Sequence, residues 1–296
     1  MTLWRRDANP EALLDRISRP WRTREQLSRL ASLSRPPSEP FEFAVLGDAE
    51  PGRFWIFRAL YNRKGVFSRQ LARVQEQAVD FSVQLGDMVS RGIPRRYLEF
   101  FRELESVGVQ KPYLTVIGNH DRSRPHGGSH ARAYRRLFGR TNYSFDYGGA
   151  RFVALDSSAR RLSRLQLRWL GLVLATPLRK VIFTHMPPVH LRLWGGAAAH
   201  RMGGFTRGAR EFTDLAAKRK VERVYMGHVH GFGVQDYQGV RYVLTGGGGS
   251  PLFPSGAERF HHYLTVRVGP EGIRERVHPF QGSPFPIPSG KILLPA

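Results

Sequence analysis

Short, uninterrupted runs of apolar residues recur along the chain from Phe41 onward, separated by glycines, prolines and charged residues. Continuous apolar runs of this kind are typical of strands that are buried on both faces of a sheet. A core built from β-sheet is therefore expected from Phe41 almost to the end of the chain. The pattern predicts strands at Phe41–Leu46, Val79–Leu85, Tyr113–Ile117, Arg151–Leu155, Lys180–Thr184, Arg223–Met226, Val240–Leu244, Tyr263–Val268 and Ile273–Val277.

Helical periodicity appears in the segments between the early strands. Ser68–Ala78 and Tyr97–Val107 are predicted helices, and Leu162–Leu174 is a third. In the third helix one face is apolar, formed by Leu162, Leu165, Trp169, Leu170 and Val173. Strands that alternate with helices predict an α/β fold. The strands after residue 223 have few helices between them, which predicts a second, mostly antiparallel sheet.

We expect residues 1–39 to form a basic, helical N-terminal extension with a linker, and residues 40–296 to form the main domain. The extension contains two helix-like stretches with recurring arginines, Pro10–Ser18 and Thr23–Leu33. The proline-rich segment Ser34–Pro40 ends any helix. We expect a helical arm packed on the domain, and contact with a membrane or a nucleic acid is the alternative.

The formal net charge of the 296-residue chain is +22, from 46 lysines and arginines against 24 acidic residues. A genome rich in G and C explains the preference for arginine over lysine, but it does not explain the shortage of acids. The charge therefore indicates an anionic partner, such as a phosphorylated substrate, a nucleic acid or an anionic lipid. Nothing in the sequence indicates an obligate protein partner.

The sequence also limits where the protein acts and which ligands can hold a metal. No apolar stretch is long enough to cross a bilayer, and the charged N-terminus lacks the apolar segment of a signal peptide. We expect a cytoplasmic location, with association at a membrane surface as the alternative. Because the chain has no cysteine, any metal must bind to oxygen and imidazole ligands.

Side chains that can bind metals follow five of the predicted strands directly. Polar groups at the carboxyl ends of strands in an α/β sheet converge on one crevice, so ligands from distant parts of the sequence can meet there. A single Gly-Asp or a single histidine is usually structural, but five such elements in one order are not explained in that way. The residues concerned are Asp48, Glu50, Asp87, Asn119, His120, Asp121, His185, His228 and His230. No P-loop, nucleophile elbow or catalytic cysteine competes with this hypothesis.

The order of these motifs, GD-x-E, GD, GNHD, THMPP and GHVH, resembles the calcineurin-like metallophosphoesterase superfamily. The resemblance extends from Phe41 to about Val268. The segment FVALDSS, the LQLRWL helix and the glycine run Gly246–Gly249 resemble the branch that contains purple acid phosphatases and bacterial cyclic-nucleotide phosphodiesterases. The resemblance implies two packed mixed β-sheets flanked by helices, in a four-layer sandwich.

The resemblance also implies a centre of two divalent metal ions that hydrolyses a phosphoester. Its ligands are divided between the ions: Asp87 would bridge them, residue 50 would join Asp48 and His230 at one ion, and Asn119, His185 and His228 would hold the other. A hydroxide held between the ions would attack phosphorus. His120 would assist the leaving group and Asp121 would orient His120. Two cations suit this reaction because they screen the negative charge of the substrate and lower the pKa of bound water.

The first motif departs from the family pattern, in which Asp-x-His is usual. Here Glu50 adds a third carboxylate, which favours harder ions, so we expect manganese or iron, with zinc as the alternative. The competing interpretation is that Glu50 points away and that the first metal site is weak or empty.

Three further residues are candidate substrate ligands. Arg91 and Arg122 lie just after motifs, and arginine binds phosphate oxygens in a bidentate manner. His200 lies in the glycine-rich segment Pro187–Arg210, which is expected to overhang the crevice as a lid or as a surface loop. Hydrolysis of a phosphodiester or diphosphate is favoured over hydrolysis of a monoester. The alternative is a weak or inactive member of the fold that binds nucleic acid or anionic membrane through its basic surface.

Overall fold

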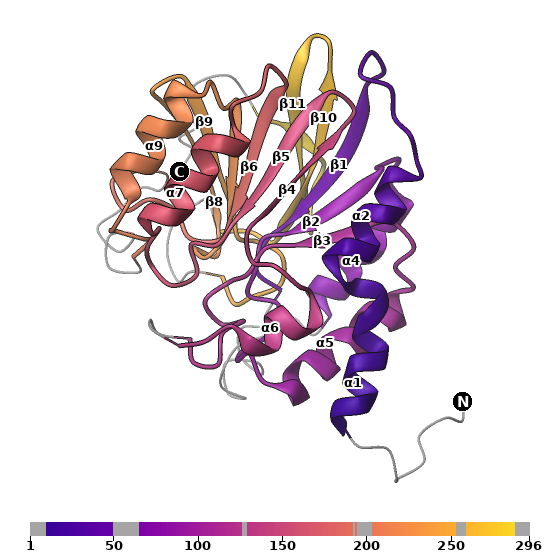
Figure 1. Cartoon of the computed structure of the whole chain (residues 1–296). Helices are drawn as coiled ribbons and strands as arrows, with labels where there is room; N and C mark the ends of the chain where they lie inside the picture. The colour runs from indigo at the N-terminus through magenta and orange to yellow at the C-terminus, as the bar shows by residue number, and fades with distance from the viewer. Residues whose placement is uncertain are drawn as a thin grey trace.

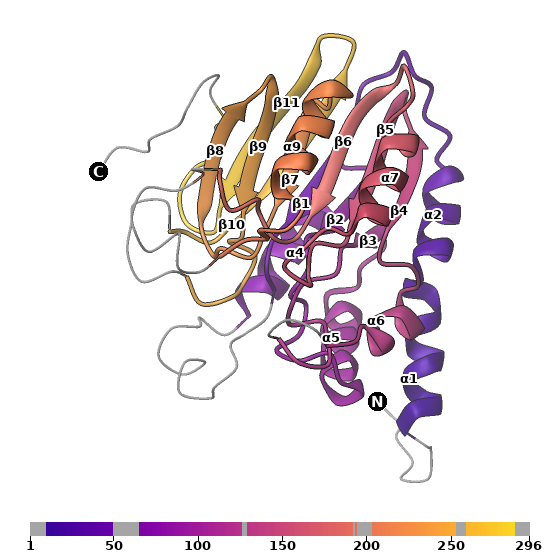
Figure 2. The ribbon, with the colours of Figure 1, turned by 60° about the vertical axis from the view of Figure 1, so that its left-hand side comes forward.

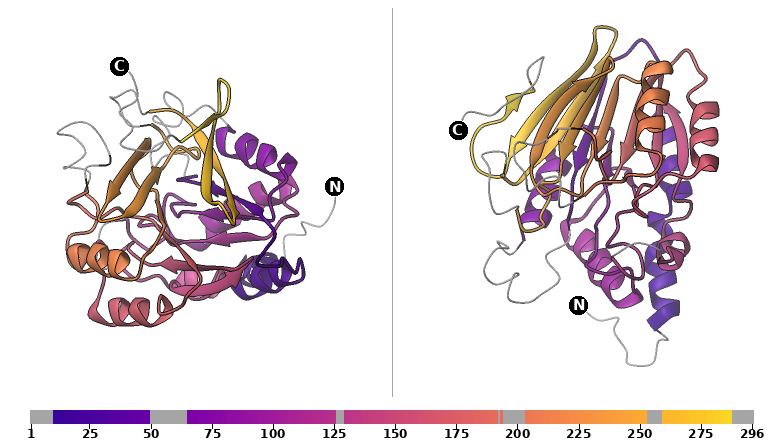
Figure 3. Two further views of the ribbon diagram at one scale, coloured as in Figure 1. Left: turned by 90° about the horizontal axis from the view of Figure 1, so that it is seen from above. Right: turned by 90° about the vertical axis from the view of Figure 1, so that its left-hand side faces the viewer.

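The computed structural model of the chain describes residues 10–49, 65–125, 129–191, 193, 203–252 and 259–287. Two six-stranded β-sheets pack face to face, and helices cover their outer faces (Figure 1). Seen from above, the helices lie on opposite sides of the pair of sheets (Figure 3). This arrangement confirms the predicted four-layer sandwich of two mixed sheets flanked by helices.

The first sheet has the strand order β12-β11-β10-β1-β2-β3. Strands β1, β2 and β3 are parallel, whereas β10 pairs antiparallel with β1 and continues into an antiparallel edge. Its strands are β1 (Phe41–Leu46), β2 (Phe81–Gln84), β3 (Tyr113–Thr115), β10 (His262–Gly269), β11 (Gly272–Pro279) and β12 (Phe285–Pro286).

The second sheet has the strand order β4-β5-β6-β7-β9-β8. Four central strands are parallel, and β4 and β8 pair antiparallel at the two edges. Its strands are β4 (Tyr143–Tyr147), β5 (Ala150–Leu155), β6 (Arg179–Thr184), β7 (Arg223–Met226), β8 (Phe232–Tyr237) and β9 (Val240–Thr245).

Helices α4 (Val66–Glu76) and α5 (Pro94–Val107) cover the first sheet, and α7 (Arg164–Val173) and α9 (Ala209–Lys218) cover the second. The N-terminal segment packs on the first of these layers: α1 (Pro10–Ser18), the short 3-10 helix η1 (Arg19–Trp21) and α2 (Thr23–Ala31) lie against α5, α6 (Arg132–Leu137) and β3. None of the described helices is both long and apolar enough to cross a membrane.

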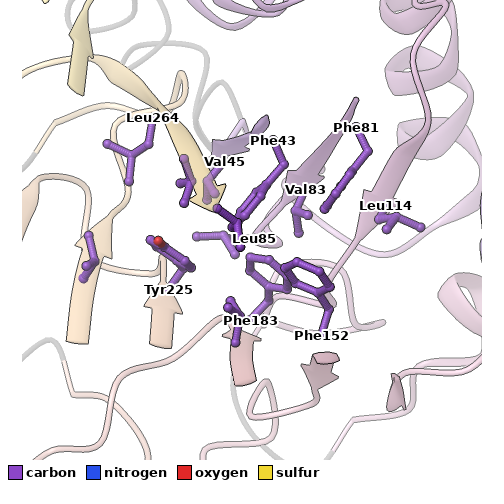
Figure 4. Close-up of a cluster of buried hydrophobic side chains, with 14 of the residues drawn as sticks. Phe43, Val45, Phe81, Val83, Leu85, Leu114, Phe152, Phe183, Tyr225 and Leu264 are labelled. Atoms are coloured by element: carbon purple, nitrogen blue, oxygen red, sulfur yellow. The ribbon is translucent and has the colours of Figure 1, made fainter. Parts of the chain in front are cut away.

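The centre of the molecule is an aromatic core between the two sheets. Phe43, on β1, stacks on Phe81 of the neighbouring strand with ring centroids 5.0 Å apart. The ring of Phe152, on β5 of the other sheet, makes a T-shaped contact with each of these rings, with centroids 5.5 Å apart. Figure 4 shows these rings, together with Phe183 and Tyr225, pointing toward one another from both sheets. Side chains from both sheets thus interdigitate, which fixes how the loops at the strand ends face one another.

The structure corrects one prediction about the sheets. The late strands do not form a sheet of their own, because β7 and β9 join the second sheet in parallel while β10 returns to pair with β1 of the first. The short strands β4, β8 and β12 and the helices α6 and α9 were not predicted. Sheet membership is decided by pairing between distant segments, for which the local pattern carries no signal.

The predicted apolar face of α7 is also partly wrong. Leu165 is 74% exposed on the outer side of the helix, whereas the predicted Leu162 and Leu170 are buried and the predicted Trp169 and Val173 pack partly buried against the same core, together with Leu167. The helix begins one residue after Ser163, whose side chain forms a capping box with Gln166. This cap fixes the start of the helix and hence which residues face the sheet.

Removing the central ring of the core is expected to destabilise the fold strongly. Phe152 is fully buried, so Phe152→Ala should lower the free energy of unfolding by about 3–5 kcal/mol through lost burial and a residual cavity. Urea denaturation followed by circular dichroism measures the change. The control is Leu172→Ala, which removes a side chain that is 75% exposed and should change stability by less than about 0.5 kcal/mol. Equal effects of the two changes would show that the aromatic cluster does not stabilise the packing of the sheets.

A second prediction concerns the contact between α4 and α5, where the Ser68 hydroxyl donates a hydrogen bond to the Glu103 carboxylate. Burial raises the pKa of Glu103, against the opposing effect of the Ser68 hydrogen bond. A raised pKa in the folded state means that the ionised carboxylate destabilises the fold as pH rises through this pKa. Glu103→Gln keeps the acceptor and removes the charge. The melting temperature should therefore rise by about 1–2 °C at pH 7, and the gain should shrink as pH falls toward 4. A gain that is the same at both pH values would contradict this origin.

Candidate metal centre

The polar loops after β1, β2, β3, β6 and β7 meet at one end of the two sheets. In Figure 2 these loops lie at the lower ends of the strands. Asp48 follows β1, Asp87 follows β2 and Asn119 follows β3. His185 comes directly after β6, and His228 follows β7. Because the strands that precede these residues run parallel within each sheet, their carboxyl ends deliver all five side chains to the same crevice.

Three of the predicted ligands form a close group. Potential ligand atoms of Asp87, His185 and His228 all lie within 4.8 Å of one another. Nε2 of His185 is 3.3 Å from Oδ2 of Asp87 and 3.0 Å from Oδ1 of Asn119. A carboxylate, two imidazoles and a carboxamide thus converge on one point of the described structure.

A second group lies beside the first. Nε2 of His230 is 3.6 Å from Oδ1 of Asp48, and the backbone N–H of His228 donates to the same carboxylate at 3.0 Å. His228 therefore connects the two groups, by its ring to one and by its backbone to the other. The remaining predicted ligand, Glu50, lies outside the described residues.

The histidine rings are fixed by hydrogen bonds on the side away from the centre. Nδ1 of His185 contacts the Leu85 carbonyl at 2.8 Å, and Nδ1 of His230 contacts the Pro251 carbonyl at 2.7 Å. In His228 the fixed nitrogen is Nε2, which lies 3.0 Å from a backbone carbonyl, that of Gly203. A carbonyl only accepts, so each of these nitrogens carries a proton and the other nitrogen of the ring is turned toward the centre, where it could bind a cation. Metal-binding histidines show this arrangement, and the residues therefore fit a divalent cation.

The electrostatics of the group favour binding of a cation. Burial tends to raise the pKa of Asp87, but the neighbouring His185 and His120 outweigh burial and hold this pKa well below its usual range. Burial lowers the pKa of His185, but the carboxylate of Asp87 reverses this and raises it to about 9. Burial and the neighbouring His185 lower the pKa of His228 to about 4. The ionised carboxylate of Asp87 and the neutral imidazole of His228 are thus already in the forms that bind metals, whereas His185 would release a proton on binding one.

Two glycines are required for the carboxylates to lie where they do. A Cβ atom on Gly118 would come within 2.1 Å of Oδ1 of Asp87, and one on Gly227 within 2.6 Å of Oδ2 of Asp48. Asp87 itself has a φ of 49°, in the left-handed region that few side chains other than asparagine and aspartate tolerate. The glycines that precede the ligands in the motifs therefore serve close packing of the loops.

His120 lies at the edge of the group, and its side chain is 24% exposed. Its Nδ1 is 3.1 Å from the Ser90 carbonyl, and its Nε2 is 4.0 Å from Oδ2 of Asp87. The ring is thus oriented by a backbone carbonyl, which leaves Nε2 facing the centre.

The contacts of Asp121 differ from its expected role, which was to orient the ring of His120. Its carboxylate is fully buried and accepts hydrogen bonds from the backbone N–H groups of Gly118 and Met88, at 2.8 and 3.0 Å. The ring of His120 bonds to Ser90 instead, so Asp121 acts on the position of two loops rather than on the ring. Burial and the nearby carboxylate of Asp87 raise the pKa of Asp121 to about 7.

The predicted substrate ligands have different surroundings. Nε of Arg91, on an exposed side chain, donates to the Ser123 carbonyl at 2.9 Å. Arg122 is 12% exposed and is held by Ser158 at 2.9 Å and by Asp156 at 3.6 Å, so its guanidinium already fastens the loop after Asn119. His200 and the central part of the predicted lid segment, residues 192 and 194–202, lie outside the described residues.

Two buried glutamines that we did not single out also hold the loops in place. Nε2 of Gln84 donates to the carbonyls of Gly47 and Gly86, and thereby joins the loops after β1 and β2. Nε2 of Gln70 donates to the carbonyls of Gly247 and Gly248 at 3.1 and 2.8 Å. The position of Gln84 within the apolar run of β2 was the only sequence signal for this loop-joining role, and Gln70 had none.

Two curated proteins are similar to this chain in sequence. A probable cyclic nucleotide phosphodiesterase of Psychrobacter sp. (strain PRwf-1) is 29% identical over 184 residues, which cover 56% of this chain and 51% of that protein. A nucleotide pyrophosphatase/phosphodiesterase of Hordeum vulgare is 25% identical over 224 residues, with 58% of each chain covered. The chain thus spans little more than half the length of these relatives.

Solved structures share the fold at low sequence identity. A purple acid phosphatase from yellow lupin (Lupinus luteus) seeds superposes with a TM-score of 0.68 at 18% identity, covering 85% of this chain and 54% of that one. The protein described as the anchor in the inner membrane complex of Plasmodium superposes with a TM-score of 0.57 at 14% identity, covering 86% and 87%. The model of the family described as calcineurin-like phosphoesterase matches residues 41–232, well over half of the sequence. These residues carry all the metal-binding motifs described above, and the chain belongs to the calcineurin-like phosphoesterase family.

Proposed function

We propose that this protein hydrolyses a phosphodiester or a diphosphate at the centre formed by Asp87, Asn119, His185 and His228, with Asp48 and His230 beside them. The convergence of the Asp87, His185 and His228 ligand atoms within 4.8 Å carries the proposal. Hydrogen bonds that hold one nitrogen of each histidine ring and turn the other toward the centre support it.

The chemistry requires divalent cations, and the arrangement of the ligands in two adjoining groups supports two of them. Bound ions would neutralise the phosphoryl oxygens and lower the pKa of the attacking water. We propose Asp87 as the ligand shared between the ions, because it lies next to His185 and carries a charge at neutral pH. Carboxylates from Asp48, Glu50 and Asp87 favour manganese or iron over zinc.

His120 is proposed to protonate the leaving oxygen. The Ser90 carbonyl holds Nδ1, so a protonated ring directs Nε2–H into the centre, where the substrate would lie. The partial exposure of His120 leaves room for a substrate on the open side. Asp121 supports this geometry indirectly, by fixing the loops that carry Asp87 and His120.

The relatives favour a diester or a diphosphate as the substrate. One is named a cyclic nucleotide phosphodiesterase and the other a nucleotide pyrophosphatase/phosphodiesterase, and both names describe cleavage of a phosphorus that carries two linkages. The net charge of +22 favours an anionic substrate, and nucleic acid and anionic lipid both satisfy this condition. The exposed guanidinium of Arg91 is the proposed first contact for such a substrate.

Replacing the proposed shared ligand should abolish metal binding and turnover together. Asp87→Asn keeps the side-chain shape and tolerates the left-handed backbone, so it removes little besides the charge. After loading with Mn²⁺, hydrolysis of bis-p-nitrophenyl phosphate should fall by at least about 100-fold, and bound metal measured by mass spectrometry should fall with it. Asp214→Asn, which changes an exposed carboxylate on α9, is the matched control and should keep both properties.

Three outcomes would contradict the proposal in different ways. Turnover of p-nitrophenyl phosphate alone would indicate a phosphomonoesterase. Full activity in Asp87→Asn would show that another site is responsible. Lack of both retained metal and turnover with Mn²⁺, Fe²⁺ and Zn²⁺ would favour a binding protein with this fold.

The role of His120 can be tested by changing the leaving group. His120→Asn should slow hydrolysis of a methyl p-nitrophenyl diester little, by about tenfold or less, because nitrophenolate leaves without a proton. A diester with two alkyl groups needs the proton and should lose about 100-fold or more. Metal content is measured in parallel and should not change. Equal losses for both substrates would show that His120 binds the phosphoryl group rather than protonating the leaving oxygen.

A further inference from the structure

A cavity lies where the N-terminal extension meets the domain. We call it the arginine cavity; its volume is about 730 Å³, and residues of α2, residues around the end of α6 and Tyr143 of β4 line it. In Figure 2 the lower end of α2 lies beside α6 and β4. The volume is within the range of about 300–1,000 Å³ that small-molecule sites occupy. No proposed metal ligand lines this cavity.

The lining is strongly positive. Among its 12 residues are five arginines and no acidic residue. Two of these arginines are paired, Arg24 with Glu25 and Arg136 with Asp15 and Glu11. The other three, at positions 22, 135 and 140, form no ion pair within the described part of the chain. Guanidinium groups that form no ion pair and lie around one cavity favour a carboxylate or a phosphate.

The floor of the cavity is apolar. Phe138 and Tyr143 are almost completely buried, at 1% and 8% exposure, and line the cavity with Leu27 and Ala31. Leu27 packs against the core between the sheets. A small inorganic anion uses none of this surface, whereas an acyl chain or an aromatic group fills it and gains from its burial.

Polar groups at the start of α2 point to the same ligand. Arg22 occupies the N-cap position, and no side chain caps the helix there. Thr23 is 8% exposed, and its Oγ1 has no hydrogen-bond partner in the described part of the protein. Nε of Arg22 is likewise buried and unpaired among these residues. Buried donors are nearly always satisfied in proteins, and the positive end of a helix favours an anion.

We propose that the arginine cavity binds an anionic amphiphile, whose carboxylate or phosphate head lies among Arg22, Arg135 and Arg140 and whose apolar tail lies on Phe138 and Tyr143. Residues 1–9 of this chain are a poor occupant, because they contain two arginines and only one acidic residue. A nucleic acid has no apolar tail to match the floor. The site does not depend on the proposed hydrolysis.

The experiment measures binding of dodecanoate to the intact, metal-loaded protein by isothermal titration calorimetry. Dodecanoate is not a phosphoester, so the proposed reaction does not consume it. Saturable binding of one molecule per chain is expected. Acetate tests the head alone and dodecyl maltoside tests the tail alone, and each should bind at least about tenfold more weakly.

The matched variants each remove two arginines, one pair at the cavity and the other pair on a different surface of the protein. Arg135→Ala/Arg140→Ala removes two exposed cavity arginines and should weaken dodecanoate binding by about tenfold or more. Arg164→Ala/Arg168→Ala removes two exposed arginines of α7 and should leave binding unchanged. Ala31→Trp, at an exposed position of the lining, should fill the apolar part and weaken binding without a change of charge.

Each outcome supports the proposal or overturns it. Equal weakening in both arginine pairs would overturn it in favour of diffuse attraction to a basic protein, and acetate binding as tight as dodecanoate would reduce the cavity to a simple anion site. Undetectable binding of dodecanoate would also overturn it. Co-sedimentation with phosphatidylcholine vesicles only when they contain phosphatidylglycerol, lost in Arg135→Ala/Arg140→Ala, would support a membrane lipid as the source. Dodecanoate binding without co-sedimentation would support a free amphiphile.

Discussion

The metal centre depends on one buried negative charge, the carboxylate of Asp87. An ionised carboxylate that is 2% exposed is costly unless charged or hydrogen-bonding groups surround it. The backbone N–H of His120 and the ring of His185 supply part of this compensation, and they come from loops after two different strands. A divalent cation at the proposed centre would supply the rest. The loops are therefore held together by the same charge that we propose binds the metal, and loss of that charge should affect structure and chemistry together.

Residues from both sheets can surround the Asp87 carboxylate only because the two sheets are packed rigidly against each other. His185 and His228 come from the second sheet, whereas Asp87 and Asn119 come from the first. The interlocked rings of Phe43, Phe81 and Phe152 set the spacing of the sheets, and close packing leaves little freedom for one sheet to slide over the other. A core residue far from the centre can thus influence the distance between ligands that it does not touch.

The sequence predicted site residues that a local pattern marks. It did not predict features that depend on pairing between distant segments, such as the assignment of strands to sheets. Asp48, Asp87 and Asn119 could be identified because each follows an apolar run and a glycine, a pattern that places a polar group at a strand end. The partition of the late strands between two sheets had no such signal, because β10 pairs with a strand more than 200 residues earlier. The carbonyls that orient the histidines, such as those of Leu85 and Ser90, could not be predicted, since every residue has one and only the fold selects it.

The N-terminal extension forms one side of the arginine cavity in addition to packing on the domain. Arg22, Thr23 and Leu27 come from the extension, whereas Arg135 and Phe138 come from the domain, so the cavity exists only when the two are packed together. The hydrogen bond from the Thr23 N–H to the Phe138 carbonyl, at 2.8 Å, fixes their relative position at this cavity. Packing of an arm on a domain requires apolar contacts, such as that of Trp21 with Phe101, but it does not require a concentration of unpaired arginines. Like charges brought together in one place lower stability, and a fold that retains them gains from an anion that separates them. The basic character of this region is therefore better explained by a ligand than by packing.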